Sequence, residues 1–406
     1  MARADITALD ATAQLAALAS LRLSAVDLLR VSLARRADVA DLGVMAGEAV
    51  DAALERAKSI DDHRALGDSL GPLAGLPLTI GEGLDIEHIR SSRFPQRKAA
   101  DAAAVARLRR AGAVIWAASK TDARNPWSPD FPTRGAHAAV AVGLTPLDLA
   151  VDRAGGLIRE ASHTGVFAHR PSRGLVRQRG ADPPGFDKMA ELDLVGLGPV
   201  ARSARDLRLA LSVLAEASIA QQAPPLELRG LKLALWLKEP QFRLDPAVKA
   251  VIESAAAELT AAGALVQVIS SPVDADQLRQ TLAKLDQGAR GRLMTHKAWL
   301  AADEVRAHLA HQTAKVFEGF EAILAPAVDA ALGATLQKFR RPLDPWPMLA
   351  VTLGLPVSVI PAGFTAHGAP VGLQVIGRAN GDSRVLSLAE SLDRLLGGYR
   401  PPPLDI

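Results

Sequence analysis

The chain contains no cysteine. This absence excludes disulfide bonds, thiolate metal sites and a cysteine nucleophile, because each of them needs a cysteine sulfur. Long apolar runs are also missing, since no stretch approaches the roughly 18 apolar residues that cross a bilayer. The residues after Met1 lack the apolar segment of a signal peptide. We therefore expect a cytoplasmic protein with no membrane partner.

Aromatic residues are scarce, at 4% of the chain, and Tyr399 is the single tyrosine. Surfaces that bind single-stranded nucleic acid use aromatic rings on which bases stack, so this shortage argues against such a surface. The net charge is only +3, and the basic residues are spread along the chain although the isoelectric point is near 9.3. No nucleic-acid partner is therefore expected.

Hydrophobic residues, in contrast, make up 49% of the 406 residues, which is enough for a large core. Residues 231–237 and 264–269 have the composition of buried strands. The segment between them is predicted to contain a helix that begins at Asp245 and Pro246, because proline suits the first helical position. A strand–helix–strand unit of this kind favours an α/β fold.

The periodicity of apolar residues is uneven elsewhere. The chain up to about residue 64 is predicted to be helical, with a capping box at Ser24. Residues 101–110 are predicted to form a helix that Asp101 caps. The stretch 125–174, rich in glycine, proline and alanine, has weak periodicity of either kind.

Several segments resemble, in the same order, the characteristic segments of the amidase signature family, whose members hydrolyse amides with a lysine, a serine in a cis peptide and a nucleophilic serine. These segments are GPLAGLP at 71–77, RLRRAGAVIW at 107–116, PSRG at 171–174, GPVARSARDL at 198–207 and GLPVSVIPAGFTAHGAPVGLQVIG at 354–377. The length is similar to that of the short, malonamidase-like members.

The resemblance implies an α/β amidase signature fold, with a single large twisted mixed β-sheet covered by α-helices on both faces. We expect one domain over residues 1–406. Within it we expect an N-terminal helical part (1–64), a degenerate signature core (71–215) and a C-terminal α/β part (226–406). The family also implies a homodimer. No cofactor and no metal are expected.

The positions of the family's catalytic side chains are occupied by residues that lack them. The lysine position is Gly81, within PLTIGE, and the nucleophile position is Gly156, within VDRAGGL. A gapless count backwards from Val140 places Pro132 at the cis serine. Glycine offers no nucleophile and no base, and proline offers no hydroxyl relay. The sequence therefore predicts that the family's triad is lost and that hydrolysis by its mechanism is absent.

The backbone around these catalytic positions is predicted to keep the family's conformation and to bind a small carboxylate or amide. The family's oxyanion hole uses backbone N–H groups, which need no particular side chain. The ligand-binding residues that we expect are Thr133, Arg153, Ala154, Gly155, Gly156 and Arg159. Arg159 is a candidate clamp for a carboxylate. The alternative for Arg159 is an ordinary ion pair with Glu160 or Asp152.

Other polar side chains near the old site are weaker candidates. His137 and His163 are possible general bases, although a histidine packed in the core is the commoner case. Lys120 is a possible replacement amine, or simply a solvated lysine. Ser162 follows Ala161 in a run of small residues, which favours a packing role. His308 and His311 share a helical face, and an exposed polar face explains them better than a metal site.

Three functions follow from this pattern. The first is a catalytically impaired homologue, a pseudoenzyme, that binds a small ligand or a protein partner. The second is an amide hydrolase with a rebuilt catalytic site, which the polar residues His137, Arg153, Glu160 and His163 motivate. The third is an assembly component without a functional pocket. The first is our main hypothesis.

Overall fold

The structure is a computed structural model, and it describes residues 3–90, 100–181, 191–219, 224–240, 242–289, 294–332 and 345–403. The helices are α1 (Arg3–Ala8), α2 (Ala11–Ala19), α3 (Ala25–Asp38), η1 (Ala40–Leu42), α4 (Val50–Ala65), α5 (Ala103–Arg110), α6 (Gly135–Ala141), α7 (Gly156–Thr164), α8 (Ala204–Leu214), α9 (Pro246–Ala261), α10 (Ala275–Ala289), α11 (His296–Gly319), α12 (Pro345–Leu353) and α13 (Asp382–Leu396). The strands are β1 (Met45–Glu48), β2 (Pro77–Gly81), β3 (Val114–Ser119), β4 (Ala123–Asn125), β5 (Ser128–Thr133), β6 (Leu147–Arg153), β7 (Phe167–Arg170), β8 (Val195–Ala201), β9 (Lys232–Trp236), β10 (Leu265–Ile269), β11 (Ala322–Pro326), β12 (Val357–Phe364) and β13 (Pro370–Ile376).

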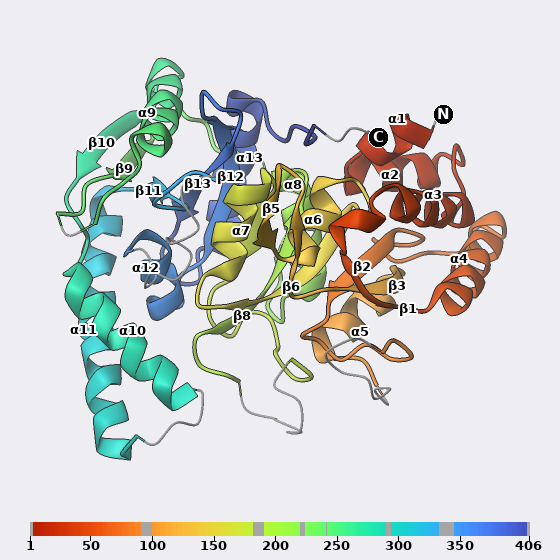
Figure 1. Cartoon of the computed structure of the whole chain (residues 1–406), viewed down its shortest axis with the longest axis horizontal. Helices are drawn as coiled ribbons and strands as arrows, with labels where there is room; N and C mark the ends of the chain where they lie inside the picture. The colour runs from red at the N-terminus through yellow and green to blue at the C-terminus, as the bar shows by residue number, and fades with distance from the viewer. Residues whose placement is uncertain are drawn as a thin grey trace.

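One mixed sheet of 11 strands runs through the described part of the chain, in the order β1-β3-β2-β6-β8-β7-β12-β13-β11-β9-β10. Parallel pairs such as β2–β6 and β9–β10 lie on either side of a central run of antiparallel pairs, which includes β6–β8 and β12–β13. The sheet runs from the N-terminal segment at one side of the molecule to β9 and β10 at the other (Figure 1). The predicted α/β class with a single large mixed sheet is confirmed.

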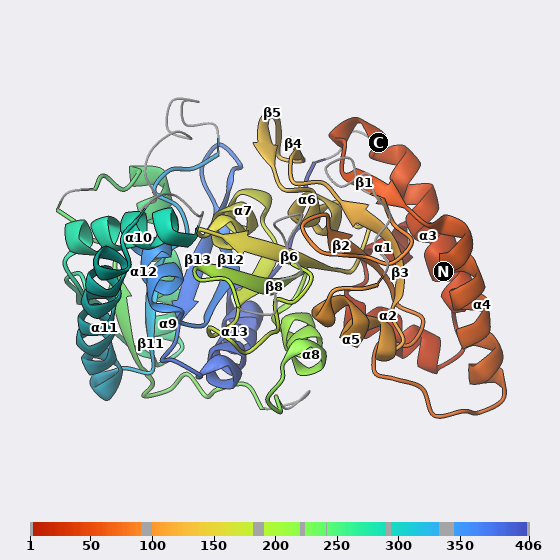
Figure 2. The same ribbon diagram turned by 90° about the horizontal axis from the view of Figure 1, so that it is seen from below.

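Helices cover both faces of this sheet. In Figure 2, α6 and α7 lie above the central strands, and α8 and α13 lie below them. The face under α6 and α7 is packed with a cluster that includes Ala136, Ala150 and Leu157. The opposite face is packed with a second cluster that includes Leu147, Leu149 and Val151. Because side chains alternate along a strand, β6 supplies residues to both layers of the core.

Most of the local signals in the sequence are confirmed. Strands β9 and β10 are parallel neighbours, and Asp245 caps the intervening helix α9, which begins at Pro246. Ser24 forms the predicted capping box with Asp27. The predicted cap at Asp101 is wrong. The N-cap of α5 is Ala102, without a side-chain cap, because the Asp101 carboxylate instead accepts hydrogen bonds from Arg109 and from the amide of Glu87.

Two regions contain more sheet than the sequence indicated. The N-terminal part is not only helical, since β1 pairs with β3 and forms one edge of the sheet. The weakly periodic stretch 125–174 contains the end of β4 together with β5, α6, β6, α7 and β7. These elements are short, and the buried ones mix apolar residues with buried polar ones such as Asp148 and His169, so neither a helical nor a strand period is visible.

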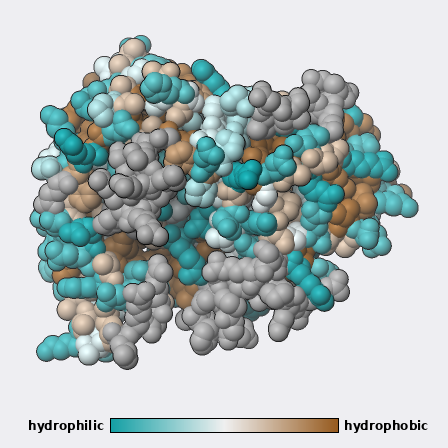
Figure 3. Space-filling view, viewed as in Figure 1, coloured by the Kyte–Doolittle hydropathy of each residue, from teal (hydrophilic) through white to brown (hydrophobic). Residues whose placement is uncertain are grey.

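Hydrophilic side chains predominate on the face shown in Figure 3, with hydrophobic spots scattered among them. Within the described residues, no helix combines the length and the apolar character that crossing a membrane requires.

Candidate functional site

The two glycines expected at the old catalytic positions lie on neighbouring elements. Gly81 is the last residue of β2, and β2 runs parallel to β6 in the sheet. Strand β6 ends at Arg153, and a short turn leads into α7, which begins at Gly156. The carboxyl ends of two parallel strands and the start of the following helix thus meet at one edge, as is usual for binding sites in α/β proteins.

The turn between β6 and α7 has an unusual backbone. Ala154 and Gly155 both adopt left-handed conformations, with φ of 58° and 81°. Asp152 holds the start of the helix, because its Oδ1 accepts a hydrogen bond from the amide of Leu157 at 3.1 Å. Its Oδ2 accepts one from Nε of Arg170 at 2.7 Å, and both side chains are buried. A buried, paired carboxylate of this kind keeps the turn in place.

Arg134 occupies the space above Gly156. A Cβ placed on Gly156 would lie 2.9 Å from both Nε and Nη2 of the Arg134 guanidinium. Arg134 is the N-cap residue of α6, and the amide of Ala138 donates to its carbonyl oxygen. None of the sequence predictions named Arg134. The available signal was a long, charged arginine two residues after Pro132, at the start of a stretch of mainly small residues.

A cavity of about 100 Å³ lies on the Gly81 side of Arg134. Its lining residues come from the ends of β2, β3 and β6 and from the start of α6. They are Gly81, Glu82, Gly83, Lys120, Thr121, Arg134, Ala136, Ala150, Val151 and Arg153. Of the ligand-binding residues expected from the sequence, this cavity includes Arg153. The turn residues Ala154 to Gly156 lie beyond Arg134, next to the cavity rather than in its lining.

Thr133 and Pro132 lie at the end of the hairpin formed by β4 and β5. Pro132 is exposed and pairs with Arg124 in that hairpin. Thr133 is buried, and its hydroxyl donates to Oε2 of Glu160 at 2.8 Å. A hydroxyl on a carboxylate has the geometry of a nucleophile and its base. Neither residue lines the cavity.

The expected alternative for Arg159, an ion pair with Glu160 or Asp152, is not present among the described residues. Asp152 pairs with Arg170, and Glu160 accepts the hydroxyl of Thr133. The Arg159 amide donates to the carbonyl oxygen of Gly155 within α7, and its side chain is half-buried. Its role as an anion clamp stays a prediction.

The two histidines near the site are buried. Nε2 of His137 lies 3.1 Å from the carbonyl oxygen of Leu157, so this nitrogen carries the proton, and Nδ1 has no partner in the described part of the chain. Burial lowers the pKa of His137 to about 4, although the charge of Glu160 opposes this effect. Burial also lowers the pKa of His163, against the charge of Glu160. Both imidazoles are therefore neutral at pH 7 and are weak bases.

Two further sequence candidates have clear positions. Lys120 follows β3 and lines the cavity, half-buried, rather than standing free on the surface. The hydroxyl of Ser162 accepts a hydrogen bond from the amide of Gly372 at 2.8 Å, which joins α7 to β13. That contact supports the packing role expected of Ser162.

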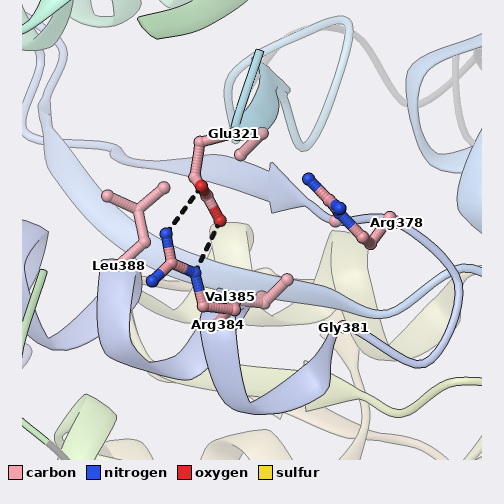
Figure 4. A pocket seen from close by; sticks show the side chains of 8 residues that line it. Glu321, Arg378, Gly381, Arg384, Val385 and Leu388 are labelled. Atoms are coloured by element: carbon pink, nitrogen blue, oxygen red, sulfur yellow. Dashed lines mark hydrogen bonds and ion pairs between the residues drawn. The ribbon is translucent and has the colours of Figure 1, made fainter. Parts of the chain in front are cut away.

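One further pocket and one pair of histidines have little capacity to bind a ligand. The pocket between β11 and α13 has a volume of about 10 Å³, and Arg384 closes it with a two-pronged ion pair to Glu321 (Figure 4). His308 contacts Glu304 on an exposed face of α11. Over the residues that the structure describes, no group of three metal-ligating side chains is close enough to hold an ion.

Comparison with known proteins identifies the family. The family model described as Amidase matches residues 27–285 and 274–386, which together cover most of the chain. The chain belongs to the amidase signature family. The curated relatives of this amidase signature protein include a subunit of the glutamyl-tRNA(Gln) amidotransferase of Symbiobacterium thermophilum, which is 27% identical over 94% of this chain and 95% of the relative. The protein of the same name from Roseiflexus castenholzii is 28% identical over 87% and 89%.

Solved structures show the same fold. One described as a crystal structure of amidase has a TM-score of 0.82 at 24% identity, over 96% of this chain and 100% of the other. Fatty acid amide hydrolase has a TM-score of 0.84 at 18% identity, over 97% and 86%. A third, described as a vestigial protein complex that reveals the origins of an s-triazine catabolic enzyme, has a TM-score of 0.81 at 25% identity, over 97% and 100%.

Proposed function

We propose that this amidase signature protein does not hydrolyse amides and instead binds a small ligand, or a protein partner, at the remains of the family's active site. The observation that carries this proposal is the guanidinium of Arg134 above Gly156. A serine at this position would place its side chain where Arg134 now lies. Gly156 and Arg134 thus fit one another, and a side chain at position 156 would have to displace the guanidinium.

Gly81 and Pro132, at the family's lysine and cis-serine positions, also support a non-hydrolytic role. Gly81 carries no side chain that accepts a proton, and a Cβ there would lie 3.1 Å from the carbonyl oxygen of Leu149. Pro132 has no hydroxyl. In a serine protease the loss of the nucleophile alone lowers turnover by roughly 10⁶-fold, and the rest of the site adds only about 10³- to 10⁴-fold over water. Such a remnant does not sustain a dedicated hydrolase.

A second candidate, an amide hydrolase with a rebuilt site, is favoured by one contact. The hydroxyl of Thr133 lies 2.8 Å from Oε2 of Glu160, within the reach that a base needs. Two observations weigh against it. Thr133 is only 4% exposed, and the cavity of about 100 Å³ does not include it. A substrate carbonyl would have to displace the packing around Thr133 before the hydroxyl could attack it.

Ammonia release from a panel of small primary amides and amino-acid amides tests the non-hydrolytic role. We expect the unmodified chain to give no release above background, beside an active family member as the positive control. The double reversion Gly81→Lys, Gly156→Ser should also stay inactive, because Arg134 and Pro132 remain. Adding Arg134→Gly and Pro132→Ser removes both obstacles.

Turnover that survives repurification of the unmodified chain would overturn the non-hydrolytic role. Thr133→Ala and Glu160→Gln then separate the two mechanisms. Loss of at least about 100-fold in both variants would support the rebuilt site, because a nucleophile and its base act as a unit. Turnover that both variants retain would exclude it.

The partner role rests on the relatives. Those at 26–28% identity are named as one subunit of an amidotransferase, and one solved neighbour is described as a protein complex. For this chain we propose a homodimer or a hetero-complex. Light scattering of the purified protein distinguishes them, since a homodimer doubles the mass of 42.6 kDa. A monomer over a wide concentration range would leave only a hetero-partner.

A further inference from the structure

The cavity beside Gly81 is unusual in its charge. Among its ten lining residues are three cations, Lys120, Arg134 and Arg153, and one carboxylate, Glu82. The expected site placed the ligand over Gly156, but the guanidinium of Arg134 covers that glycine. The open space lies on the other side of Arg134.

The backbone holds Lys120 and Arg134 close together. The amide of Gly135 donates to the carbonyl oxygen of Lys120 at 2.9 Å. The amide of Lys120 in turn donates to the carbonyl oxygen of Val44 at 2.8 Å. A Cβ on Gly135 would lie 2.7 Å from the Lys120 nitrogen and 2.9 Å from its oxygen, so only glycine permits this approach. The strand end that carries Lys120 and the helix start that carries Arg134 are therefore locked side by side.

The ammonium group of Lys120 and the guanidinium group of Arg134 form no ion pair within the described chain. Both side chains are half-buried, and neither has an ion pair or a side-chain hydrogen bond there. Two like charges held at one cavity repel each other, and partial burial increases that cost. An anion that accepts hydrogen bonds from both would offset it.

Glu82, in contrast to the two cations, favours a ligand that carries a hydrogen-bond donor. It is 4% exposed, and its Oε1 accepts a hydrogen bond from the amide of Thr121 at 2.6 Å. An ionised carboxylate has several lone-pair sites and can accept a further donor. A fully deprotonated anion would meet repulsion on this side, whereas an anion that carries one O–H group would donate to Glu82.

We infer that this cavity binds a small oxyanion that carries an O–H donor, with Lys120 and Arg134 on its charged oxygens and Glu82 on its hydroxyl. The volume of about 100 Å³ suits a ligand of a few heavy atoms, because liquid water takes about 30 Å³ per molecule. Hydrogen phosphate and a short hydroxy acid share this chemistry. The site presupposes the non-hydrolytic, ligand-binding role proposed above and defines its ligand class.

Titration calorimetry at pH 7 with four probes tests this inference. Inorganic phosphate retains an O–H group at this pH, and sulfate is a dianion of similar shape without one. Glycolate and acetate form the corresponding carboxylate pair. We expect phosphate or glycolate to bind at least about tenfold more tightly than its matched control, since a hydrogen bond to a charged group contributes that much. The stronger of the two then identifies the source of the oxyanion.

Substitutions locate the binding. Arg134→Met and Lys120→Met should each weaken binding by about tenfold or more. Glu82→Gln should reduce the preference for phosphate over sulfate. Arg36→Met is the matched control, because Arg36 is also half-buried but lies outside the cavity lining, and it should change affinity by less than about twofold.

Gly156→Ala gives a steric version of the same test. The added Cβ would displace the flexible end of Arg134 without removing its charge. Helix α7 should tolerate alanine at its first position, so the variant should fold normally and bind the oxyanion more weakly. Circular dichroism of each variant shows whether it is folded.

Two results would overturn the inference: no saturable binding of any probe, or unchanged affinity in both folded Arg134→Met and Lys120→Met. The ammonia assay on the same preparations separates this failure from a failure of the proposed function. Amide turnover refutes the non-hydrolytic role whatever the calorimetry shows. Absence of both turnover and anion binding refutes only the oxyanion site.

Discussion

Asp148 is a buried acid on β6, beside the strand that ends at Gly81. It is 3% exposed, and its Oδ2 accepts a hydrogen bond from the hydroxyl of Thr79 at 2.6 Å. Among the described residues, its Oδ1 has no partner. Burial raises the pKa of Asp148 to about 7, although the hydrogen bond from Thr79 opposes the shift. The carboxyl therefore holds its proton through the mildly acidic range.

Asp148→Asn should change how stability depends on pH. The folded pKa of about 7 lies above the ordinary value of 3.8, so the stabilising effect of the bound proton is complete below about pH 4 and is lost as the pH rises through 7. Asparagine is neutral at every pH. The variant should match the wild type near pH 4 and exceed its free energy of unfolding at pH 8 by on the order of 3 kcal/mol.

Urea unfolding at pH 4 and pH 8 measures this difference. Asp122→Asn is the control, because Asp122 is exposed. Parallel pH profiles for Asp148→Asn and the wild type would show that Asp148 ionises normally in the folded protein.

At the scale of elements, the start of α2 is held by a residue of α8. The Asp206 carboxylate accepts hydrogen bonds from the amide of Ala11 at 2.7 Å, the amide of Thr12 at 2.9 Å and the hydroxyl of Thr12 at 2.6 Å. Asp10 caps the same helix through the amide of Ala13. Burial, followed by the nearby charge of Asp10, raises the pKa of Asp206 to about 6. A helix that is weakly amphipathic on its own is thus fixed by long-range capping.

Asp206→Ala should release α2 locally and weaken the whole fold. It leaves two backbone donors and a hydroxyl without their acceptor, which costs about 2–4 kcal/mol of unfolding free energy. Hydrogen exchange should become faster in α2 than elsewhere. Asp27→Ala, which removes the exposed capping box of α3, is the matched control and should cost only about 1 kcal/mol. Unchanged protection in α2 would contradict the capping role.

At the scale of the molecule, Asp382 ties the C-terminal helix to the centre of the sheet. Its carboxylate accepts the amide of Ser172 at 2.8 Å and the hydroxyl of Ser172 at 2.5 Å, and it lies 3.2 Å from Nε2 of His169. Burial raises the pKa of Asp382, but the hydrogen bonds from His169 and Ser172 outweigh it, and the pKa is lower than usual. Stability from this contact is therefore present above about pH 4 and is lost as the pH falls through the lowered pKa.

Asp382→Ala should lower the free energy of unfolding at pH 7 by about 3 kcal/mol, because it leaves buried donors unpaired. Arg384→Ala in the same helix removes only a surface pair with Glu321 and should cost less than about 1 kcal/mol. Guanidinium denaturation followed by tryptophan fluorescence and by circular dichroism compares the two. Equal costs for the two variants would mean that the buried contact is no stronger than a surface pair.

The sequence by itself determined the fold class and most of the local elements, since the signals are short-range. Asp245 and Pro246 begin α9, and Ser24 caps α3, because capping depends on residues a turn apart. Ordered motif segments carried the family resemblance and placed Gly81 and Gly156 at the expected catalytic positions. The predicted cap at Asp101 was wrong, because the Asp101 carboxylate accepts hydrogen bonds from Arg109 and from the amide of Glu87 instead.

Only the tertiary structure decided what surrounds those positions. Arg134 reaches Gly156, and Lys120 contacts Gly135 at the start of α6, through packing between elements that are separated along the chain. Periodicity and motif spacing describe the backbone near one residue, whereas a site depends on which side chains face one cavity. The charge of the cavity, the neutral His137 and the raised pKa of Asp148 follow from burial, which exists only once the sheet and its helices have assembled.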